Sequence, residues 1–455
     1  MTGVRKRQER RAFEVRPSGP PPDEEEDEEN ENRLPSRWHL AIASYQIFLI
    51  YLNYSIVIPT VHKYAESLDA PGGFAGGFAG VLVGAASVGA AVLQPLYRLL
   101  LKRSYAVTFL VQACLMLVGS IIYALAGLAR TWSLLLVGRV IGGLGGSAYP
   151  VMTFLSEAVG KKHRSNVTSI VIGVSRSLGY ALGPVFAAAL VYVDFRVGEL
   201  TIDKRNNPGF FIALLCVGQL VAVSWSFPRE GSKLVDKKET NESRLPTTSE
   251  AAAEDKSKKE KVVHLLTLSW FAVTVFSCPI LICGWELGAT KLLQGAFGWS
   301  IQSSALALGG IIMCTIVPLL LGGKLTYKFS DAFIERVSFT ISLVSCVGLF
   351  AYGSESEISV WARTLPYLIS SFILMNFVTL PTVLAYSHVT KVCRASEIER
   401  MQNLLSVVGY LSRGVGAVTG DLLSPNALAG LFMGLLSFIL VTNLLLGKRL
   451  LPKVS

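Results

Sequence analysis

Runs of about 20 mostly apolar residues recur along the whole chain, and they limit what it can fold into more than any other feature. Each run is long enough for one helix to cross the hydrocarbon core of a bilayer. Apolar residues make up 51% of the 455 residues and charged residues 16%, which leaves too little polar sequence to cover a water-soluble fold. We therefore expect an all-α integral membrane protein, with twelve spans at residues 39–61, 74–97, 105–128, 131–159, 167–193, 208–228, 262–286, 300–324, 335–353, 359–390, 402–423 and 425–447.

The formal charge of +10 follows this topology. Most of the 42 Lys and Arg flank the spans on the side that holds the N-terminus. The positive-inside rule then places both termini in the cytoplasm. We therefore expect the lipid bilayer, and not a nucleic acid, to account for the basic charge. The basic residues that we place on the opposite side are Lys63, Arg130, Arg196, Lys204, Arg205 and Lys291.

The polar segments divide the chain into two halves of six spans each. Residues 1–38 are rich in charge and predict a disordered cytoplasmic tail without a cleavable signal sequence. Residues 229–261 predict a solvated cytoplasmic linker, and 448–455 a second cytoplasmic tail. The two halves are then 39–228 and 262–447.

An arginine followed by two glycines occurs in equivalent spans of the two halves. The fifth span contains "SRSLGYALG" from Ser175, and the eleventh contains "SRGVGAVTG" from Ser412. Each has the spacing Arg-x-x-Gly-x-x-x-Gly, which puts the three residues on one helix face. Glycine faces pack on protein, so we expect each arginine to face the bundle interior, as in transporters built from parallel repeats. The residues are Arg176, Gly179 and Gly183, and Arg413, Gly416 and Gly420.

An arginine at a helix centre costs about 2.5–3.5 kcal/mol to insert, so these two need a task or a partner. A planar guanidinium suits phosphate or carboxylate oxygens, which favours an anion clamp. The alternative is structural. Each arginine could bind a backbone carbonyl, reach the cytoplasmic edge, or pair with a carboxylate such as Glu157, Glu286 or Asp421.

Other polar residues within or beside the spans are candidates for the same site. Arg139 in the fourth span adds positive potential, and Asn53 and Tyr54 give the first span polar groups that could line a cavity. Glu286 at the end of the seventh span could carry a proton, or could be a helix end paired with Lys291.

A basic pair follows the first span. We interpret His62 and Lys63 as an interfacial pair, with attraction of an anion at the lumenal mouth as the alternative.

The sequence has no P-loop, no His/Cys metal spacing and no nucleophile elbow. We expect no enzyme activity, no metal, no cofactor and no direct use of ATP.

The arrangement resembles the major facilitator superfamily. "LLLVGRVIGGLGGSAYP" is similar to its fourth-span motif and "GYALGPVF" to its fifth-span Gly-Pro motif. The loop "QPLYRLLLKRSY" stands where the superfamily has an acidic-basic motif, but lacks the usual aspartate. "GGKLTYKFSDAF" is a weak second copy that keeps Asp331. The resemblance implies a twelve-span fold of two six-helix halves.

Within the superfamily the chain is similar to the transporter part of plant SPX-domain vacuolar phosphate transporters, and more distantly to the lysosomal ceroid-lipofuscinosis transporters. The matching segments are "YLNYSIVIPTVHKYAESLDAP", "NNPGFFIALL", "SWSFPRE", "FGWSIQSSALAL" and "LSRGVGAVTGD". Two departures stand out. The 38 residues before the first span cannot hold an SPX domain, and "AYPVMTFLSE" lacks the basic cluster that the plant family carries in its fourth span.

The resemblance implies a secondary active transporter that works by alternating access in a vacuolar or lysosomal membrane. We expect a small anionic substrate, with inorganic phosphate as the first candidate and protons or another ion for coupling. Spans 1, 4, 5, 7, 10 and 11 would line the site, with Arg139, Arg176 and Arg413 supplying positive potential. The alternatives are a carrier of organic anions, chloride or other solutes of lysosome-like membranes, and a receptor or scaffold that binds without transporting.

Overall fold

A computed structural model gives the fold. Most of the tail expected at residues 1–38, and much of the linker expected at 229–261, lie outside the residues that it describes. The side chains of Asp331 and of residues 251–269 are also not described. The structure describes residues 34–71, 77–160, 163, 167–198, 200–231, 251–325, 328–350, 360–392 and 395–450.

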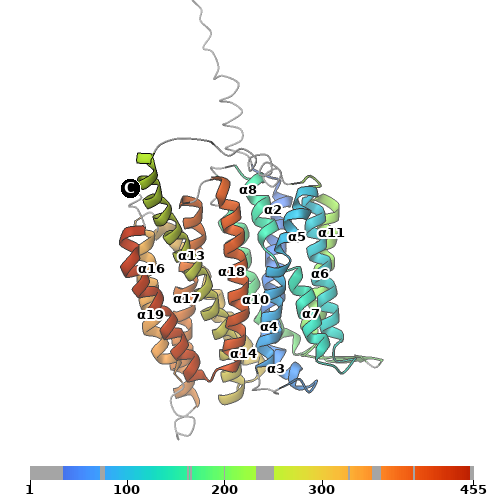
Figure 1. The fold of residues 1–455 in the computed structure, drawn as a ribbon. Helices are drawn as coiled ribbons and strands as arrows, with labels where there is room; N and C mark the ends of the chain where they lie inside the picture. Colours follow the sequence, from blue (N-terminus) through green and yellow to red (C-terminus); the bar gives the residue numbers. More distant parts are fainter. Residues whose placement is uncertain are drawn as a thin grey trace, which may run out of the picture.

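Two groups of helices stand side by side, the first coloured blue to green and the second yellow to red (Figure 1). A two-stranded antiparallel hairpin follows α10, with β1 (Phe195–Val197) pairing with β2 (Leu200–Ile202). The helices of the first group, here the N-half, are α2 (Arg37–Ser55), α3 (Ile58–Glu66), α4 (Phe78–Val92), α5 (Gln94–Arg103), α6 (Tyr105–Leu125), α7 (Ser133–Leu144), α8 (Tyr149–Ala158), η3 (Ser169–Val174), α10 (Ser175–Leu190) and α11 (Asn207–Ser226).

The second group, here the C-half, repeats this order of long helices. Its first helix, α13, already begins at Ala251, inside the segment expected as a linker. The helices of the C-half are α13 (Ala251–Lys291), η4 (Leu292–Ala296), α14 (Ile301–Cys314), α15 (Ile316–Leu325), α16 (Asp331–Ser345), η5 (Cys346–Leu349), α17 (Val360–Val392), α18 (Ala395–Leu422) and α19 (Pro425–Leu450).

The helices agree with a chain that crosses a membrane many times. In the described residues, 8 helices are long and apolar enough to cross, or up to 10 if each bent pair is one span. The helices α16 and α18 occupy the positions of the ninth and eleventh predicted spans, which is consistent with twelve. The multi-pass all-α fold expected from the sequence is therefore confirmed.

Prolines explain where the spans bend. The α2–α3 pair bends by 41° and the α4–α5 pair by 45°, and each second helix has a proline in its first turn, Pro59 and Pro95. Proline has no amide hydrogen, so the helix hydrogen bonds are interrupted there. The fourth predicted span, residues 131–159, is broken between α7 and α8, just before Pro150.

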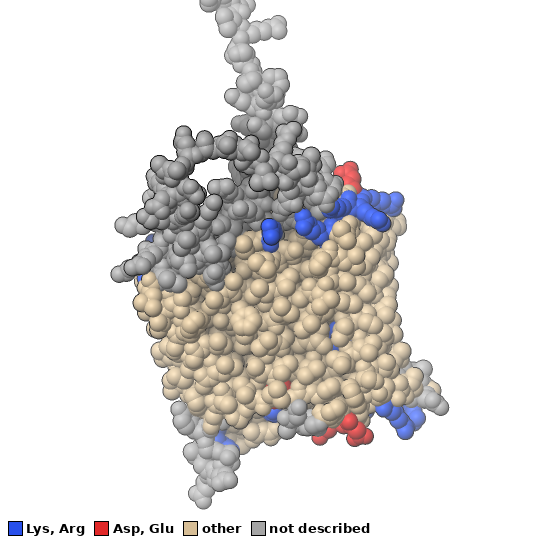
Figure 2. All heavy atoms as spheres, in the orientation of Figure 1, with Lys and Arg blue, Asp and Glu red and all other residues tan. Residues whose placement is uncertain are grey.

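On the face drawn in Figure 2, a broad apolar band separates two charged ends. Exposed aromatic side chains lie near the ends of the spans, as at the two interfaces of a membrane. Trp38 and Trp225 lie at the end where α2 begins, here the Arg37 side, and Tyr192 and Trp361 lie at the end that carries the β1–β2 hairpin, here the hairpin side.

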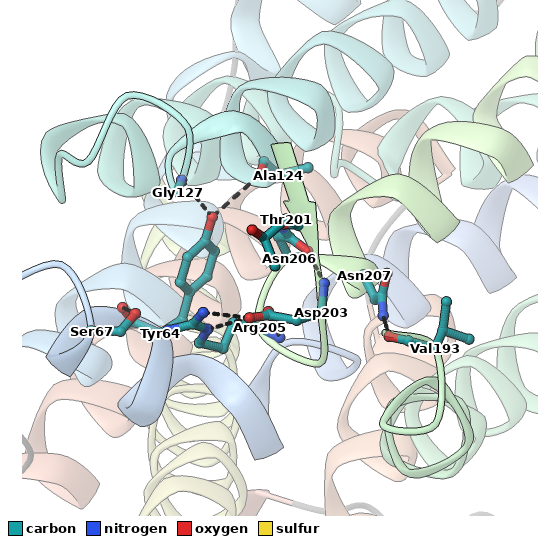
Figure 3. Close-up of polar contacts among 10 residues, drawn as sticks. All are labelled: Tyr64, Ser67, Ala124, Gly127, Val193, Thr201, Asp203, Arg205, Asn206 and Asn207. Atoms are coloured by element: carbon teal, nitrogen blue, oxygen red, sulfur yellow. Dashed lines mark hydrogen bonds and ion pairs between the residues drawn. The ribbon is translucent and has the colours of Figure 1, made fainter. Parts of the chain in front are cut away.

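On the hairpin side, hydrogen bonds join α3 to the end of α6 and hold the loop that follows β2 (Figure 3). The Tyr64 hydroxyl accepts the amide of Gly127 at 2.9 Å and donates to the carbonyl of Ala124 at 3.3 Å. Next to the hairpin, Arg205 donates to the Asp203 carboxylate through Nε at 2.7 Å and also through Nη2. These bonds raise the pKa of Arg205 and hold its charge in the loop.

The two halves approach each other most closely on the hairpin side and at mid-depth. There α4 packs against α18, and α10 packs against α14. A Cβ at Gly80 of α4 would lie 2.5 Å from the Ala417 carbonyl oxygen, and one at Gly309 of α14 would lie 2.9 Å from the Ala181 oxygen. These approaches leave no room for a side chain, so the halves are in direct backbone contact.

Candidate functional site

Two arginines from opposite halves lie against the same pair of tyrosine rings. The guanidinium carbon of Arg176 is 5.3 Å from the ring centroid of Tyr51 and 5.8 Å from that of Tyr180. The corresponding distances for Arg413 are 5.2 Å and 5.9 Å. All four distances fall within the range of cation–π contacts. Two positive charges are therefore held side by side between the halves.

The glycine motifs explain why both arginines point inward. In α10, a Cβ at Gly179 would lie 2.6 Å from the Phe48 carbonyl oxygen of α2. In α18, a Cβ at Gly416 would lie 2.8 Å from the Ile280 oxygen of α13. Each motif thus packs on the first helix of its own half. This confirms that the glycine faces contact protein, and it carries the arginines to the interface.

A third tyrosine holds Arg413 in place. The Tyr410 ring centroid is 5.3 Å from the Arg413 guanidinium, and the Tyr410 hydroxyl accepts the amide of Ala148 at 2.8 Å. That amide belongs to the break between α7 and α8, where an intrahelical partner is missing. Tyr410 therefore connects Arg413 in the C-half to the broken fourth span of the N-half.

A buried carboxylate faces the two arginines. Glu286 of α13 is 1% exposed, and it interacts electrostatically with Arg413 more strongly than with Arg176. The Tyr54 side chain adjoins it. The Tyr54 hydroxyl and Glu286 Oε2 are both buried, and neither has a hydrogen-bond partner of ordinary geometry in the described part of the chain.

Arg139 has a different environment from the other two arginines. It is buried, and it donates to the carbonyl oxygens of Asn53 at 2.9 Å and Leu82 at 3.4 Å, so it joins α7 to α2 and α4. The Asn53 side chain lies beside Gly142 of α7. Tyr54 interacts electrostatically with both Arg139 and Glu286 and so lies between the two groups.

Of the residues predicted from the sequence, the structure brings Tyr54, Arg176, Glu286 and Arg413 together and places Arg139 and Asn53 beside them. Sequence reasoning missed the tyrosines at 51, 180 and 410. A signal for them was present. Each lies three or four residues from a predicted site residue, on the same helix face.

A separate hollow of about 620 Å³ opens on the hairpin side, and neither Arg176 nor Arg413 lines it. Its lining combines acidic and basic side chains in equal number, so it offers no excess of positive charge to an anion. The charged residues are Lys63, Lys204 and Arg205, and Glu66, Asp194 and Asp203. The cluster of Arg176, Arg413 and the tyrosines at 51, 180 and 410 is therefore the stronger candidate.

Comparison with known proteins identifies the family. The profile of the Major Facilitator Superfamily matches residues 44–417. The chain belongs to the major facilitator superfamily. In this superfamily member, the cluster of Arg176, Arg413 and their tyrosines lies at the contact between the two halves.

The chain is also similar in sequence to plant membrane proteins. An SPX domain-containing membrane protein of Arabidopsis thaliana is 29% identical over 180 residues, which is 40% of this chain and 25% of the relative. One from Oryza sativa subsp. indica is 30% identical over 178 residues, 39% of this chain and 24% of the relative. The match spans about a quarter of the length of these relatives.

Solved superfamily structures share the fold at low identity. A D-xylose–proton symporter has a TM-score of 0.70 at 13% identity, covering 91% of this chain and 97% of its own. A bacterial homologue of the human lysosomal transporter Spinster, inward-facing and unoccupied, gives 0.59 at 12% identity over 91% and 96% of the two chains. The human organic anion transporter MFSD10 gives 0.58 at 16% identity over 90% and 99%.

Proposed function

We propose that this protein is a secondary active transporter of a small anion, with inorganic phosphate as the first candidate. The observation that carries the proposal is the pair Arg176 and Arg413, one from each half, on the shared rings of Tyr51 and Tyr180. Like charges placed this close repel each other, and an anion between them removes that repulsion. The planar guanidinium also matches the oxygens of phosphate with two hydrogen bonds.

Glu286 supplies a means of coupling to protons. With Glu286 ionised, two guanidiniums and one carboxylate leave one net positive charge in the cluster. Protonation of Glu286 leaves two, which strengthens attraction of an anion. A bound proton therefore raises the affinity for the anion, and a bound anion raises the affinity for the proton by the same factor. The proposed mechanism is co-transport of the anion with a proton held by Glu286 beside Tyr54.

The position of the site suggests alternating access. The anion site lies between the halves, and the closest backbone approaches between them are at mid-depth and on the hairpin side. By the positive-inside rule, the Arg37 side faces the cytosol. We propose that this conformation is closed toward the lumen, and that rocking of the halves exposes the site on the other side.

The choice of phosphate and of a vacuolar or lysosomal membrane comes from the sequence resemblance and not from the names of the plant relatives. The plant relatives are named for an SPX domain and for being membrane proteins. The sequence resemblance to vacuolar phosphate transporters, together with the arginine pair, favours phosphate and a vacuolar or lysosomal membrane.

One feature of the site favours a second candidate. The tyrosine rings at 51, 180 and 410 give the arginines an aromatic surface, which suits an organic carboxylate better than it suits phosphate. An organic-anion carrier is therefore the alternative substrate class.

Purified protein in liposomes decides between these functions. We expect radiolabelled phosphate to accumulate when the proton gradient is imposed in the coupled direction, and unlabelled phosphate to compete with it. Uptake of an aromatic carboxylate, with no competition by phosphate, would favour the organic-anion carrier. Saturable anion binding without any flux would instead indicate a receptor and contradict transport.

A further inference from the structure

Asp421, at the hairpin-side end of α18, contacts both halves of the protein. Its Oδ2 accepts the amide of Gly80 in the first turn of α4 at 2.7 Å. Its Oδ1 lies 3.7 Å from Nδ1 of His62 in α3 and 4.0 Å from Nζ of Lys291 in α13. Lys291 also donates to the backbone carbonyl of Asp421. Gly80 and His62 belong to the N-half, whereas Lys291 belongs to the C-half, like Asp421 itself.

This contact is built into the interior. The side chains of His62 and Asp421 are 0% and 1% exposed, and that of Lys291 is 24% exposed. A Cβ at Gly80 would lie 2.9 Å from the Asp421 Cβ, so only glycine lets the carboxylate reach the start of α4. The positive end of the α4 dipole favours a negative charge at this position.

A second bond joins the halves at the same end. Gln294, which follows α13, donates through Nε2 to the carbonyl oxygen of Pro59 in α3 at 3.0 Å. The hairpin side is therefore closed by polar contacts that link α3 and α4 to the ends of α13 and α18. Opening this side must break the contacts from Asp421 to His62 and Gly80, but leaves Lys291 beside Asp421.

We propose that His62 and Asp421 form a proton-binding gate on the hairpin side, separate from the anion site, in which a proton taken up by His62 holds the halves closed. The inference rests on the alternating access described under the proposed function. It assigns a second proton site to the transport cycle, in addition to Glu286.

Whether acid closes or opens the gate depends on which partners of Asp421 move away when the halves separate. In the part of the chain that the structure describes, the charged side chains within 4.0 Å of the Asp421 carboxylate are His62 from α3 and Lys291 from α13, and α4 contributes a backbone amide. Lys291 travels with Asp421, so its attraction is present in both states. Imidazole is the side chain that ordinarily titrates between about pH 5 and 8. Protonated His62 pairs with ionised Asp421 only when the gate is closed, so closing binds a proton and acid favours closing.

Spin labels across the gate test this without any substrate. The labels are attached to Glu66→Cys at the end of α3 and to Ala427→Cys in α19, in full-length protein whose seven native cysteines are replaced. Both positions are exposed on the hairpin side, the first in the N-half and the second in the C-half. Pulsed distance measurements in lipid nanodiscs compare pH 7.5 with pH 5.5. A single linked proton changes an equilibrium by at most about tenfold per pH unit, and we expect the ratio of closed to open protein to rise at least about threefold on acidification.

Variants isolate the two groups. His62→Gln and Asp421→Asn should both abolish this pH response. The matched control is His39→Gln, which removes a histidine bound to the Ser226 carbonyl on the Arg37 side, and it should keep the response. If Asp421→Asn does not yield monodisperse protein, His62→Gln alone decides.

Three results would overturn the gate: no pH response in the parent protein, a response of opposite sign, or a response that persists in His62→Gln. The measurement uses no anion, so the gate can fail while phosphate transport holds. Conversely, a protein that carries no phosphate can still show the gate.

Discussion

Arg176 and Arg413 are 237 positions apart in the chain, yet their guanidiniums lie 5.3 Å and 5.2 Å from the same Tyr51 ring. Arg176 belongs to the N-half and Arg413 to the C-half, and each begins a copy of the Arg-x-x-Gly-x-x-x-Gly motif. A substrate bound by both must interact with both halves at once. This is the relationship that a transporter needs if binding is to be coupled to movement of one half against the other.

The glycines of the C-half motif should be required for assembly. A Cβ at Gly416 would lie 2.8 Å from the Ile280 Cα, so Gly416→Ala forces α18 away from α13. Overpacking of this kind costs about 1–3 kcal/mol, and we expect a lower thermal unfolding temperature for the purified protein. Gly430→Ala is the control, because a Cβ there meets nothing within 4 Å. Equal unfolding temperatures for the two variants would contradict this packing.

The Tyr180 ring should contribute to anion affinity through the arginines. Tyr180→Leu removes the ring beside both guanidiniums and should weaken binding at least about two- to fivefold, since a cation–π contact is worth about 0.5–1 kcal/mol when exposed and about 2 kcal/mol when desolvated, as this one is. Tyr180→Phe keeps the ring and should bind nearly as well as the parent protein. Titration of the anion against both purified variants measures this. An equal loss in both would show that the hydroxyl, and not the ring, is what matters.

Glu286 should determine the pH dependence of transport. Glu286→Gln keeps the shape of the side chain but cannot exchange a proton. We expect a proton gradient no longer to drive net uptake and the pH profile of transport to flatten, while exchange of anion for anion continues. Liposome assays of both modes give the answer. A pH profile identical to that of the parent protein would leave Glu286 as a structural helix residue.

The topology prediction is open to a direct test. Basic residues concentrate on the side that holds the N-terminus, so epitope tags at either terminus should be reached by antibody only after the plasma membrane is permeabilised, with organelle membranes intact. A tag at the hairpin, between β1 and β2, should stay protected under the same conditions. The reverse pattern would invert the orientation and place the gate in the cytosol.

The sequence was enough to predict the parts of this fold that repeat. Apolar runs gave the spans, and the Arg-x-x-Gly-x-x-x-Gly spacing gave the faces of α10 and α18 that contact protein. Both depend on local periodicity, which a single helix displays by itself. The fourth predicted span, residues 131–159, is longer than one straight crossing needs, but the place of its break depends on Pro150 and on contacts with neighbouring helices.

The sequence was not enough to predict which polar groups meet. Lys291, considered as a partner of Glu286, contacts Asp421 on a different helix. Arg139 was grouped with the other arginines by charge, but it binds the backbone of α2 and α4. In both cases the choice depends on the relative rotation and depth of helices distant in sequence. No periodicity within one span carries that information.

Anion affinity in folded Arg413→Ala protein tests the central claim most directly. A charge-assisted hydrogen bond is worth about 1.5–3 kcal/mol, so the variant should bind phosphate at least about tenfold more weakly than the parent protein. Arg413→Lys keeps the charge without the planar fork and should give an intermediate affinity. The measurement is phosphate titration of each variant after size-exclusion and thermal unfolding have shown it to be folded. Parent-like affinity in folded Arg413→Ala protein would contradict an anion site shared between the two halves.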